Sequence, residues 1–215
     1  MELTLLAISK LQVIGTIISI VVVLMILAAI RAKRVFSLRK LTESDIAGVE
    51  GEKLASDMIK AVLNDGDRFF SNLVVNYNGK RAELDNVIVN CNGIFIIEVK
   101  NYSGRLVGNA DDYEWSKFHE SAAGITYEKI VKNPIKQVKR QVYVLAGYLR
   151  EAGINVWING CALLLQKNSP VDDPCVLQSA DDIDRAIHTH GRTHFDDRTI
   201  SDICRCLENV PEYVI

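Results

Sequence analysis

The segment RAELDNVIVNCNGIFIIEVKNYSG, from Arg81 to Gly104, has the composition of a buried β-hairpin that also contains charged side chains. Two apolar runs of strand length flank Asn92-Gly93, a pair typical of a two-residue type I′ turn because both central residues of that turn need positive φ. Such a turn pairs Cys91 with Ile94. The predicted register therefore places Asp85 opposite Lys100.

This register brings three charged groups onto one face of the hairpin. Glu98 and Lys100 point the same way because strand side chains alternate, and Glu98 becomes the diagonal neighbour of Asp85. Ionised carboxylates are costly to bury among aliphatic residues unless they are paired or hold a metal. A plain cross-strand ion pair between Asp85 and Lys100 is the simpler alternative, and the spacing alone does not choose between an ion pair and a catalytic site.

The rest of the chain predicts a mixed α/β domain around this hairpin. The expected elements before and after it are a helix over 49–63, a strand over 71–77 ending at an Asn78-Gly79 turn, and a smaller hairpin over 105–107 and 113–118. A second helix begins with Asn133 as N-cap and Pro134 in its first turn, and Gly153 closes it. The remaining elements are strands over 156–165 and 175–178 and helices near 180–189 and 197–208. The order helix, three strands, helix, strand predicts helices packed on a sheet with the hairpin near its centre.

The N-terminal region predicts a membrane anchor. Residues 11–30 (LQVIGTIISIVVVLMILAAI) contain no charge and are long enough, at about 1.5 Å per residue, to cross a bilayer as a helix. A cleaved signal peptide has a shorter apolar region behind a basic start, whereas here the basic residues follow the apolar run. These residues are Arg31, Lys33, Arg34, Arg39 and Lys40. They predict a single-pass protein with its N-terminus outside and its C-terminal domain in the cytoplasm, where contact with anionic lipid headgroups would follow.

Composition restricts how the chain could bind nucleic acid. Residues 41–215 contain 19 Lys and Arg against 26 Asp and Glu, so binding by bulk positive charge is excluded and any such contact needs a local patch. The five cysteines cannot all pair within one chain, which agrees with a reducing compartment. The histidines in the segment HTHGRTH, residues 188–194, lack a second ligand set at zinc-finger spacing and are expected at the surface.

Asp85, followed by Glu98-Val99-Lys100, resembles the D…ExK signature of the PD-(D/E)xK nuclease superfamily. That signature alone is weak, but an ordered set of further motifs resembles the nuclease-related domain (NERD) over about residues 46–166, with Leu84 at the proline position of the superfamily's name. The motifs are Gly51-Glu52, Ala82-Glu83-Leu84-Asp85, Ile97-Glu98-Val99-Lys100-Asn101 with Ser103-Gly104, Trp115, and Asn133-Pro134 with Gln137.

The resemblance implies a restriction-endonuclease-like mixed sheet core (α-β-β-β-α-β) and a Mg²⁺-dependent nuclease that hydrolyses phosphodiester bonds of nucleic acid, with DNA as the expected substrate. By position, it makes Asp85 and Glu98 metal ligands, Lys100 the residue that orients or activates water, and Glu52 an acid near the metal. Gln137 would lie at the edge of the site.

The predicted chemistry suits these residue types. Mg²⁺, for which Mn²⁺ is a substitute, takes oxygen ligands and keeps several waters, so Asp85, Glu98 and the Val99 backbone carbonyl are a sufficient donor set. Lys100 can stabilise negative charge on the reacting phosphorus, or accept a proton if burial lowers its pKa.

Four basic residues assigned to the second helix are candidate nucleic-acid contacts: Lys132, Lys136, Lys139 and Arg140. A merely solvated polar helix face is the simpler interpretation. The predicted organisation is a short segment at 1–10, a transmembrane helix at 11–30, a basic linker at 31–45, a nuclease-like domain at 46–166 and an acidic extension at 167–215. The alternative function is a catalytically inactive module that binds nucleic acid or serves as a scaffold at the membrane.

Overall fold

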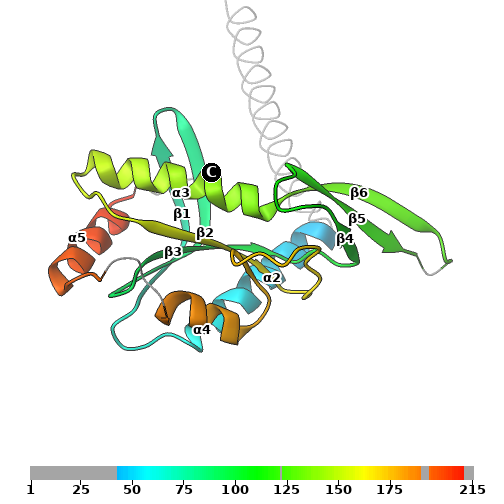
Figure 1. Cartoon of the computed structure of the whole chain (residues 1–215), viewed down its shortest axis with the longest axis horizontal. Helices are drawn as coiled ribbons and strands as arrows, with labels where there is room; N and C mark the ends of the chain where they lie inside the picture. Colours follow the sequence, from blue (N-terminus) through cyan, green and yellow to red (C-terminus); the bar gives the residue numbers. More distant parts are fainter. Residues whose placement is uncertain (1–42, 122, 190–193, 211–215) are drawn as a thin grey trace, which may run out of the picture. The chain divides into compact units, whose positions relative to one another are not determined.

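The computed structural model describes residues 43–121, 123–189 and 194–210 (Figure 1). The chain divides into two compact units, residues 1–46 and 47–215, and the second contains all the strands described below. The predicted transmembrane helix at 11–30, the segment before it and most of the basic linker lie outside the described residues. Among the residues that are described, no helix is both long and apolar enough to cross a bilayer.

A five-stranded mixed sheet forms the centre of the second unit. Its strand order is β1-β2-β3-β7-β8. The pairs β1–β2 and β2–β3 are antiparallel, whereas the pairs β3–β7 and β7–β8 are parallel. The strands are β1 (Arg68–Tyr77), β2 (Lys80–Asn90), β3 (Gly93–Lys100), β7 (Ile158–Leu164) and β8 (Val176–Leu177). The predicted mixed α/β class is confirmed, and the hairpin of β2 and β3 lies at the centre of the sheet.

Helices cover both faces of this sheet (Figure 1). They are α2 (Glu43–Lys60), α3 (Pro134–Glu151), α4 (Ala180–His188) and α5 (Asp197–Glu208). Residues of α3 and α5 pack with Ile94 and Ile96 on one face, whereas residues of α2 and α4 pack with Phe95 and Ile97 on the other. Burial on both faces explains why β3 is an almost unbroken apolar run.

Asn133 connects the start of α3 to the preceding loop. Its side chain accepts a hydrogen bond from the Ile135 N–H (2.9 Å), as an N-cap does, and Pro134 follows in the first turn as predicted. Its amide also donates to the backbone carbonyls of Asn109, Ala110 and Asp112. One side chain therefore caps the helix and holds the loop.

A second, antiparallel sheet of three strands projects beside the N-terminal end of α3, and we call it the arm (Figure 1). Its strands are β4 (Arg105–Val107), β5 (Glu114–Glu120) and β6 (Thr126–Lys132). The predicted hairpin of β4 and β5 is confirmed, but the sequence analysis missed β6. The available signal was a group of residue types typical of strands, Tyr127, Ile130 and Val131, after Gly124, which has a φ of 75°.

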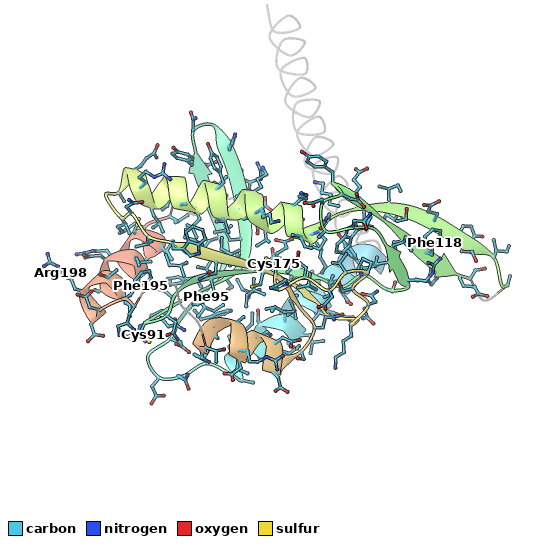
Figure 2. The ribbon with its side chains drawn as sticks, in the orientation of Figure 1. Cys91, Phe95, Phe118, Cys175, Phe195 and Arg198 are labelled. Atoms are coloured by element: carbon cyan, nitrogen blue, oxygen red, sulfur yellow. The ribbon has the colours of Figure 1, made fainter. Side chains whose placement is uncertain are left out.

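The turn between β2 and β3 lies one residue earlier than predicted. Asn90 pairs with Gly93, so the loop residues are Cys91 and Asn92, and neither has a positive φ. The Asn90 side chain accepts from the Asn92 N–H (2.9 Å), and both asparagine amides donate to the Ile187 carbonyl at the end of α4. The Phe195 N–H also donates to the Cys91 carbonyl at 2.8 Å (Figure 2 labels both residues). These tertiary contacts outweigh the local preference for a type I′ turn at Asn92-Gly93.

The corrected turn changes the register position that lies opposite Asp85. The last paired residues of β2 and β3 are Asn86 and Ile97, and continuing this register places Asp85 opposite Glu98 instead of Lys100. In a regular strand, a partner shift of two residues would leave Asp85 on the same face as Glu98. The Asn78-Gly79 turn between β1 and β2 is as predicted, with φ values of 48° and 71°.

His188 joins α4 to the loop before β1, contrary to the expectation that it is merely a surface histidine. Its Nε2 lies 2.9 Å from Asp67 Oδ2, and its Nδ1 lies 2.7 Å from Asp184 Oδ1. Burial lowers the pKa of His188, but the hydrogen bonds and charges of the two carboxylates outweigh that effect and raise the pKa above its ordinary value.

We expect His188 to make the stability of the fold depend on pH. Because its folded pKa is raised, its contribution is fully present below about pH 6.5, the unfolded value, and is lost as pH rises through the folded pKa. The difference in unfolding free energy between the parent and His188→Gln should therefore shrink between pH 6 and 8.5, as measured by urea denaturation. His194→Gln is the matched control, because His194 is exposed and forms no ion pair among the described residues. Equal pH dependence in the parent and His188→Gln would contradict this role.

Candidate active site

The strands β2 and β3 separate where the predicted acidic residues lie. Their ladder ends at Asn86 and Ile97, although β2 extends back to Lys80 and β3 continues to Lys100. On its other side β3 stays paired with β7 as far as Lys100 and Leu164. The separation therefore opens one side of β3 and leaves the other side anchored in the sheet.

The alternation of β2 is interrupted at the same level. Ala82 and Leu84 belong to the same core cluster as Val87 and Val89, so the residues facing that cluster change from even to odd numbers between 84 and 87. The register position opposite Asp85 on β1 is Asn72, which has a φ of 55°. β1 and β2 are thus both irregular where Asn72 lies opposite Asp85, so the Asp85 side chain does not follow the regular alternation of the strand.

Asp85 closes the gap between the separated strands. Its Oδ2 accepts a hydrogen bond from the Val99 N–H at 2.8 Å, a group that β2 no longer pairs through its backbone. Burial, and after it the charge of Glu98, raises the pKa of Asp85 to about 6, although the Val99 hydrogen bond and Lys100 act in the opposite direction. Asp85 and Glu98 therefore compete for the positive charge available in the gap.

Glu98 is only 1% exposed and is surrounded by donors. Its Oε1 accepts from Lys100 Nζ and Gln137 Nε2, and its Oε2 accepts from Gln141 Nε2. Gln137 and Gln141 lie four residues apart, so they point from the same face of α3. Gln141 also donates to the Glu83 carbonyl at 2.7 Å, which ties α3 to β2 beside the gap.

Lys100 remains a cation in this arrangement. Burial lowers its pKa, but the charge of Glu98 and the hydrogen bond that Glu98 accepts raise it further, so the net shift is upward. Of the two predicted roles for Lys100, stabilisation of negative charge suits this environment better than proton acceptance.

Gly51 explains how α2 comes close to the end of β3. A Cβ at this position would lie 2.9 Å from Asn101 Cβ, so a larger residue would push the helix away. The next residue, Glu52, is exposed, and its pKa is raised first by burial and then by the charge of Asp85. Glu52 is therefore within electrostatic reach of the gap, from the helix opposite α3.

The chemistry of the donors fits a hard divalent cation. Asp85 and Glu98 supply carboxylate oxygens, and the Val99 carbonyl projects to the same side of β3 as its N–H, which faces Asp85. Oxygen donors of this kind suit Mg²⁺. In the described part of the chain, no cluster of three or more His, Cys, Asp and Glu side chains is placed to hold a metal, so the set depends on two carboxylates and a carbonyl.

The structure does not gather the four predicted basic contacts on one helix face. Lys132 is the last residue of β6 and not part of α3. Lys136 pairs with Asp111 at 3.1 Å, and Arg140 donates to the Arg81 carbonyl at 2.8 Å. These two residues directly precede Gln137 and Gln141 in the chain. Lys139 lines a cavity that is separate from the gap between β2 and β3 and is described below.

Two residues of the site were not predicted. Gln141 could have been found from its i+4 spacing to Gln137, but only the structure shows that both reach Glu98. The Tyr102 hydroxyl donates to the Lys132 carbonyl at 3.3 Å. Burial raises the pKa of Tyr102, while the charges of Lys100 and Glu98 act on it in opposite directions. Tyr102 therefore lies between the site and the arm.

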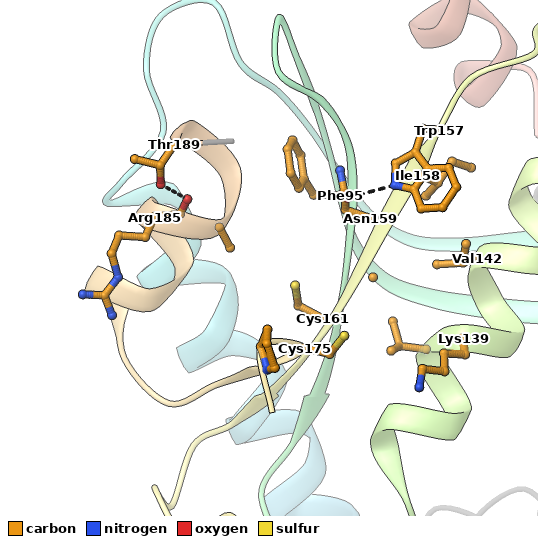
Figure 3. Close-up of a pocket in the computed structure, with 14 residues that line it drawn as sticks. Phe95, Lys139, Val142, Trp157, Ile158, Asn159, Cys161, Cys175, Arg185 and Thr189 are labelled. Atoms are coloured by element: carbon orange, nitrogen blue, oxygen red, sulfur yellow. Dashed lines mark hydrogen bonds between the residues drawn. The ribbon is translucent and has the colours of Figure 1, made fainter. Parts of the chain in front are cut away.

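The cavity beside Lys139 contains none of the site carboxylates (Figure 3). It has a volume of about 720 Å³ and lies between α3, the edge of β7 and α4. Cys161 and Cys175 line it, and burial raises the pKa of both thiols, that of Cys161 to about 12. Protonated thiols are poor nucleophiles and poor metal ligands, so this cavity does not compete as a reactive centre.

Comparison with known proteins relates the chain to one family. The model of the nuclease-related domain (NERD) matches residues 47–165, which is more than half of the chain. No curated protein and no solved structure gives a match. The matched range contains β1 to β7, α3 and every residue that meets at the gap between β2 and β3. The chain therefore belongs to the nuclease-related domain family.

Proposed function

We propose that the protein is a membrane-anchored, cytoplasm-facing nuclease that hydrolyses phosphodiester bonds of DNA with Mg²⁺ as cofactor. The observation that carries the proposal is the meeting of Asp85, Glu98 and Lys100 where β2 and β3 separate. Membership of the nuclease-related domain family supports a nuclease-like activity. We also propose that β1, β2, β3 and β7 with α2 and α3 correspond to a restriction-endonuclease-like core.

Asp85, Glu98 and the Val99 carbonyl would hold Mg²⁺, or Mn²⁺ in its place. When bound, the cation would act as a Lewis acid that polarises a phosphoryl oxygen and lowers the pKa of a water molecule. Burial, and after it the charge of Glu98, raises the pKa of Asp85 to about 6, which indicates that additional positive charge would be stabilised there. Glu52, exposed on α2, is the nearby acid that could extend the donor set.

The remaining side chains prepare this gap for a phosphate. Gln137 and Gln141 hold the Glu98 carboxylate from α3, so its oxygens are oriented before substrate binds. Lys100 is kept protonated beside them, and its ammonium can stabilise the negative charge that develops on the phosphoryl oxygens. The chain thus positions charge in a buried gap, which is the main requirement for phosphoryl transfer.

Neutralising Glu98 should abolish cleavage. Glu98→Gln preserves shape but removes the ligand charge, so we expect Mg²⁺-dependent hydrolysis of labelled DNA to fall by about 10²-fold or more. Asp85→Asn should behave alike, whereas Glu151→Gln, at an exposed position near the end of α3, serves as the charge-matched control. EDTA should abolish parental activity. This site assignment would be wrong if folded Glu98→Gln cleaved DNA at the rate of the parent, or if cleavage by the parent were unaffected by EDTA. If the parent bound nucleic acid but did not cleave it, the inactive-module alternative would be favoured.

Substitution of Lys100 separates its two predicted roles. If its charge is what matters, Lys100→Arg should retain more activity than Lys100→Met, which we expect to lose about 10²- to 10³-fold in kcat. Single-turnover cleavage at saturating Mg²⁺ measures the difference, with circular dichroism to verify folding. Equal loss in the two variants, together with a pH profile whose acidic limb disappears in both, would instead indicate proton acceptance by Lys100, because a base acts only when it is deprotonated.

The proposed anchor has an independent test. If residues 11–30 span a bilayer, the expressed chain should sediment with membranes, resist alkaline carbonate and be released by detergent. Val22→Lys/Leu24→Lys should weaken that association because each charge near the centre of a span costs about 2.5–3.5 kcal/mol on insertion scales. Carbonate extraction of the parent chain would contradict the anchor and leave the proposed nuclease site unaffected.

A further inference from the structure

The two faces of the arm carry different charges. Pairing in the arm places Lys117 directly opposite Lys129, with Trp115 opposite Val131 on one side and His119 opposite Tyr127 on the other. Leu106 of β4 lies beside Lys117. Because these residues are two apart along each strand, they share one face, which we call the lysine face.

The lysine face contains no carboxylate from its own strands. The three acids of β5 and β6 are Glu114, Glu120 and Glu128, and their even numbers place all of them on the opposite face. There, Glu128 accepts from the Ser116 hydroxyl at 2.6 Å, and the Arg105 guanidinium lies 4.6 Å from the ring centre of Phe118, a residue labelled in Figure 2. The carboxylates of β5 and β6 are therefore confined to one face of this small sheet.

Lys117 and Lys129 form an uncompensated pair of cations. Residues directly opposite in an antiparallel ladder have Cβ atoms about 5 Å apart, and like charges in such positions are destabilising. Burial, together with the charge of Lys129, lowers the pKa of Lys117, and no carboxylate contributes to that shift. Neither lysine has a salt-bridge partner within the described residues. An external anion would relieve this repulsion.

An aromatic side chain lies beyond the two lysines. Tyr127 is 56% exposed at the outer end of the lysine face. Cations followed by an exposed aromatic ring suit single-stranded nucleic acid, because phosphates pair with the cations while an unstacked base packs on the ring. A lipid headgroup would need only the cations.

The inner end of the lysine face leads to the candidate active site. Leu106 and Trp115 pack with Ile135 of α3 and Leu164 of β7, and Tyr102 packs against the same cluster. Tyr102 follows Lys100 by two residues in the chain. Lys117 follows Trp115 by two residues, roughly 7 Å along the strand. A strand bound along the lysine face would therefore approach Lys100.

We propose that the lysine face of the arm binds single-stranded nucleic acid, with Lys117 and Lys129 contacting its phosphates and Tyr127 stacking on a base. This inference rests on the proposed nuclease function and adds a substrate class and a binding surface to it. The surface lies outside the four basic residues expected from the sequence, of which Lys136 and Arg140 are engaged by Asp111 and a backbone carbonyl.

Binding measured without cleavage tests the proposal. Fluorescence anisotropy of a labelled single-stranded DNA, in EDTA and across a salt series, gives the affinity and its salt dependence for the full chain. Lys117→Gln/Lys129→Gln should weaken binding and make the slope of log K against log salt shallower by about 1.4, because each single-strand phosphate contact contributes about 0.7. Tyr127→Leu should weaken binding about fivefold or more and leave the slope unchanged.

The controls separate this proposal from loss of folding and from the proposed activity. Arg150→Gln/Arg198→Gln removes two charges from exposed positions on α3 and α5 and should keep the parental slope. Lys129→Gln alone, at the more exposed lysine, should change the slope by about half as much as the double variant. If the parent binds DNA through this face but does not cleave it in Mg²⁺, the nuclease proposal fails and the binding surface stands.

Three results would overturn the binding surface. The first is parental affinity and slope in Lys117→Gln/Lys129→Gln. The second is an absence of DNA binding by the parent chain. The third is a double variant that binds DNA like the parent but sediments less with phosphatidylserine–phosphatidylcholine vesicles. That result would mean that the two lysines contact a membrane surface.

Discussion

The arrangement of the site depends on one buried carboxylate, that of Glu98. A carboxyl group that is 1% exposed needs hydrogen-bond partners for its oxygens, and here an ammonium and two amides provide them. These donors come from β3 itself and from α3, so the helix is held against the sheet by polar contacts as well as by its apolar face. Loss of any one donor would leave charge uncompensated where β2 and β3 separate.

Asp85 shows how the fold places a second acid beside the first. A regular pairing of β2 with β3 would occupy the Val99 N–H through the backbone. The strands separate instead, β2 and β1 lose their regular alternation around Asp85 and Asn72, and a carboxylate accepts that hydrogen bond. Burial and, after it, the charge of Glu98 raise the pKa of Asp85. Lys117 and Lys129 of the arm are likewise two like charges placed close together, but positive ones. In both places the repulsion between neighbouring side chains favours binding of a ligand of opposite charge.

Prediction succeeded where local chemistry and tertiary structure agree. The Asn78-Gly79 turn, the Asn133-Pro134 helix start and the order of strands and helices follow from rules that act over a few residues. It failed where distant contacts decide, as at Asn92-Gly93, where hydrogen bonds to α4 move the turn by one residue. Asp85 still reaches the backbone beside Glu98, through the hydrogen bond that it accepts from the Val99 N–H in the gap. The strand β6 was missed because its signal is short and mostly polar.

The sequence by itself determined the mixed α/β class, the central hairpin, the convergence of Asp85, Glu98 and Lys100, and the resemblance to a nuclease-related domain. Strand periodicity and turn chemistry are local properties, so the residues that encode them are adjacent in the chain. Only the tertiary structure decided that Gln137 and Gln141 reach Glu98, that Lys100 stays protonated, and that Lys117 lies opposite Lys129. Each of these depends on which groups from separate elements come within a few ångströms, and at that range burial and charge determine both pKa and binding.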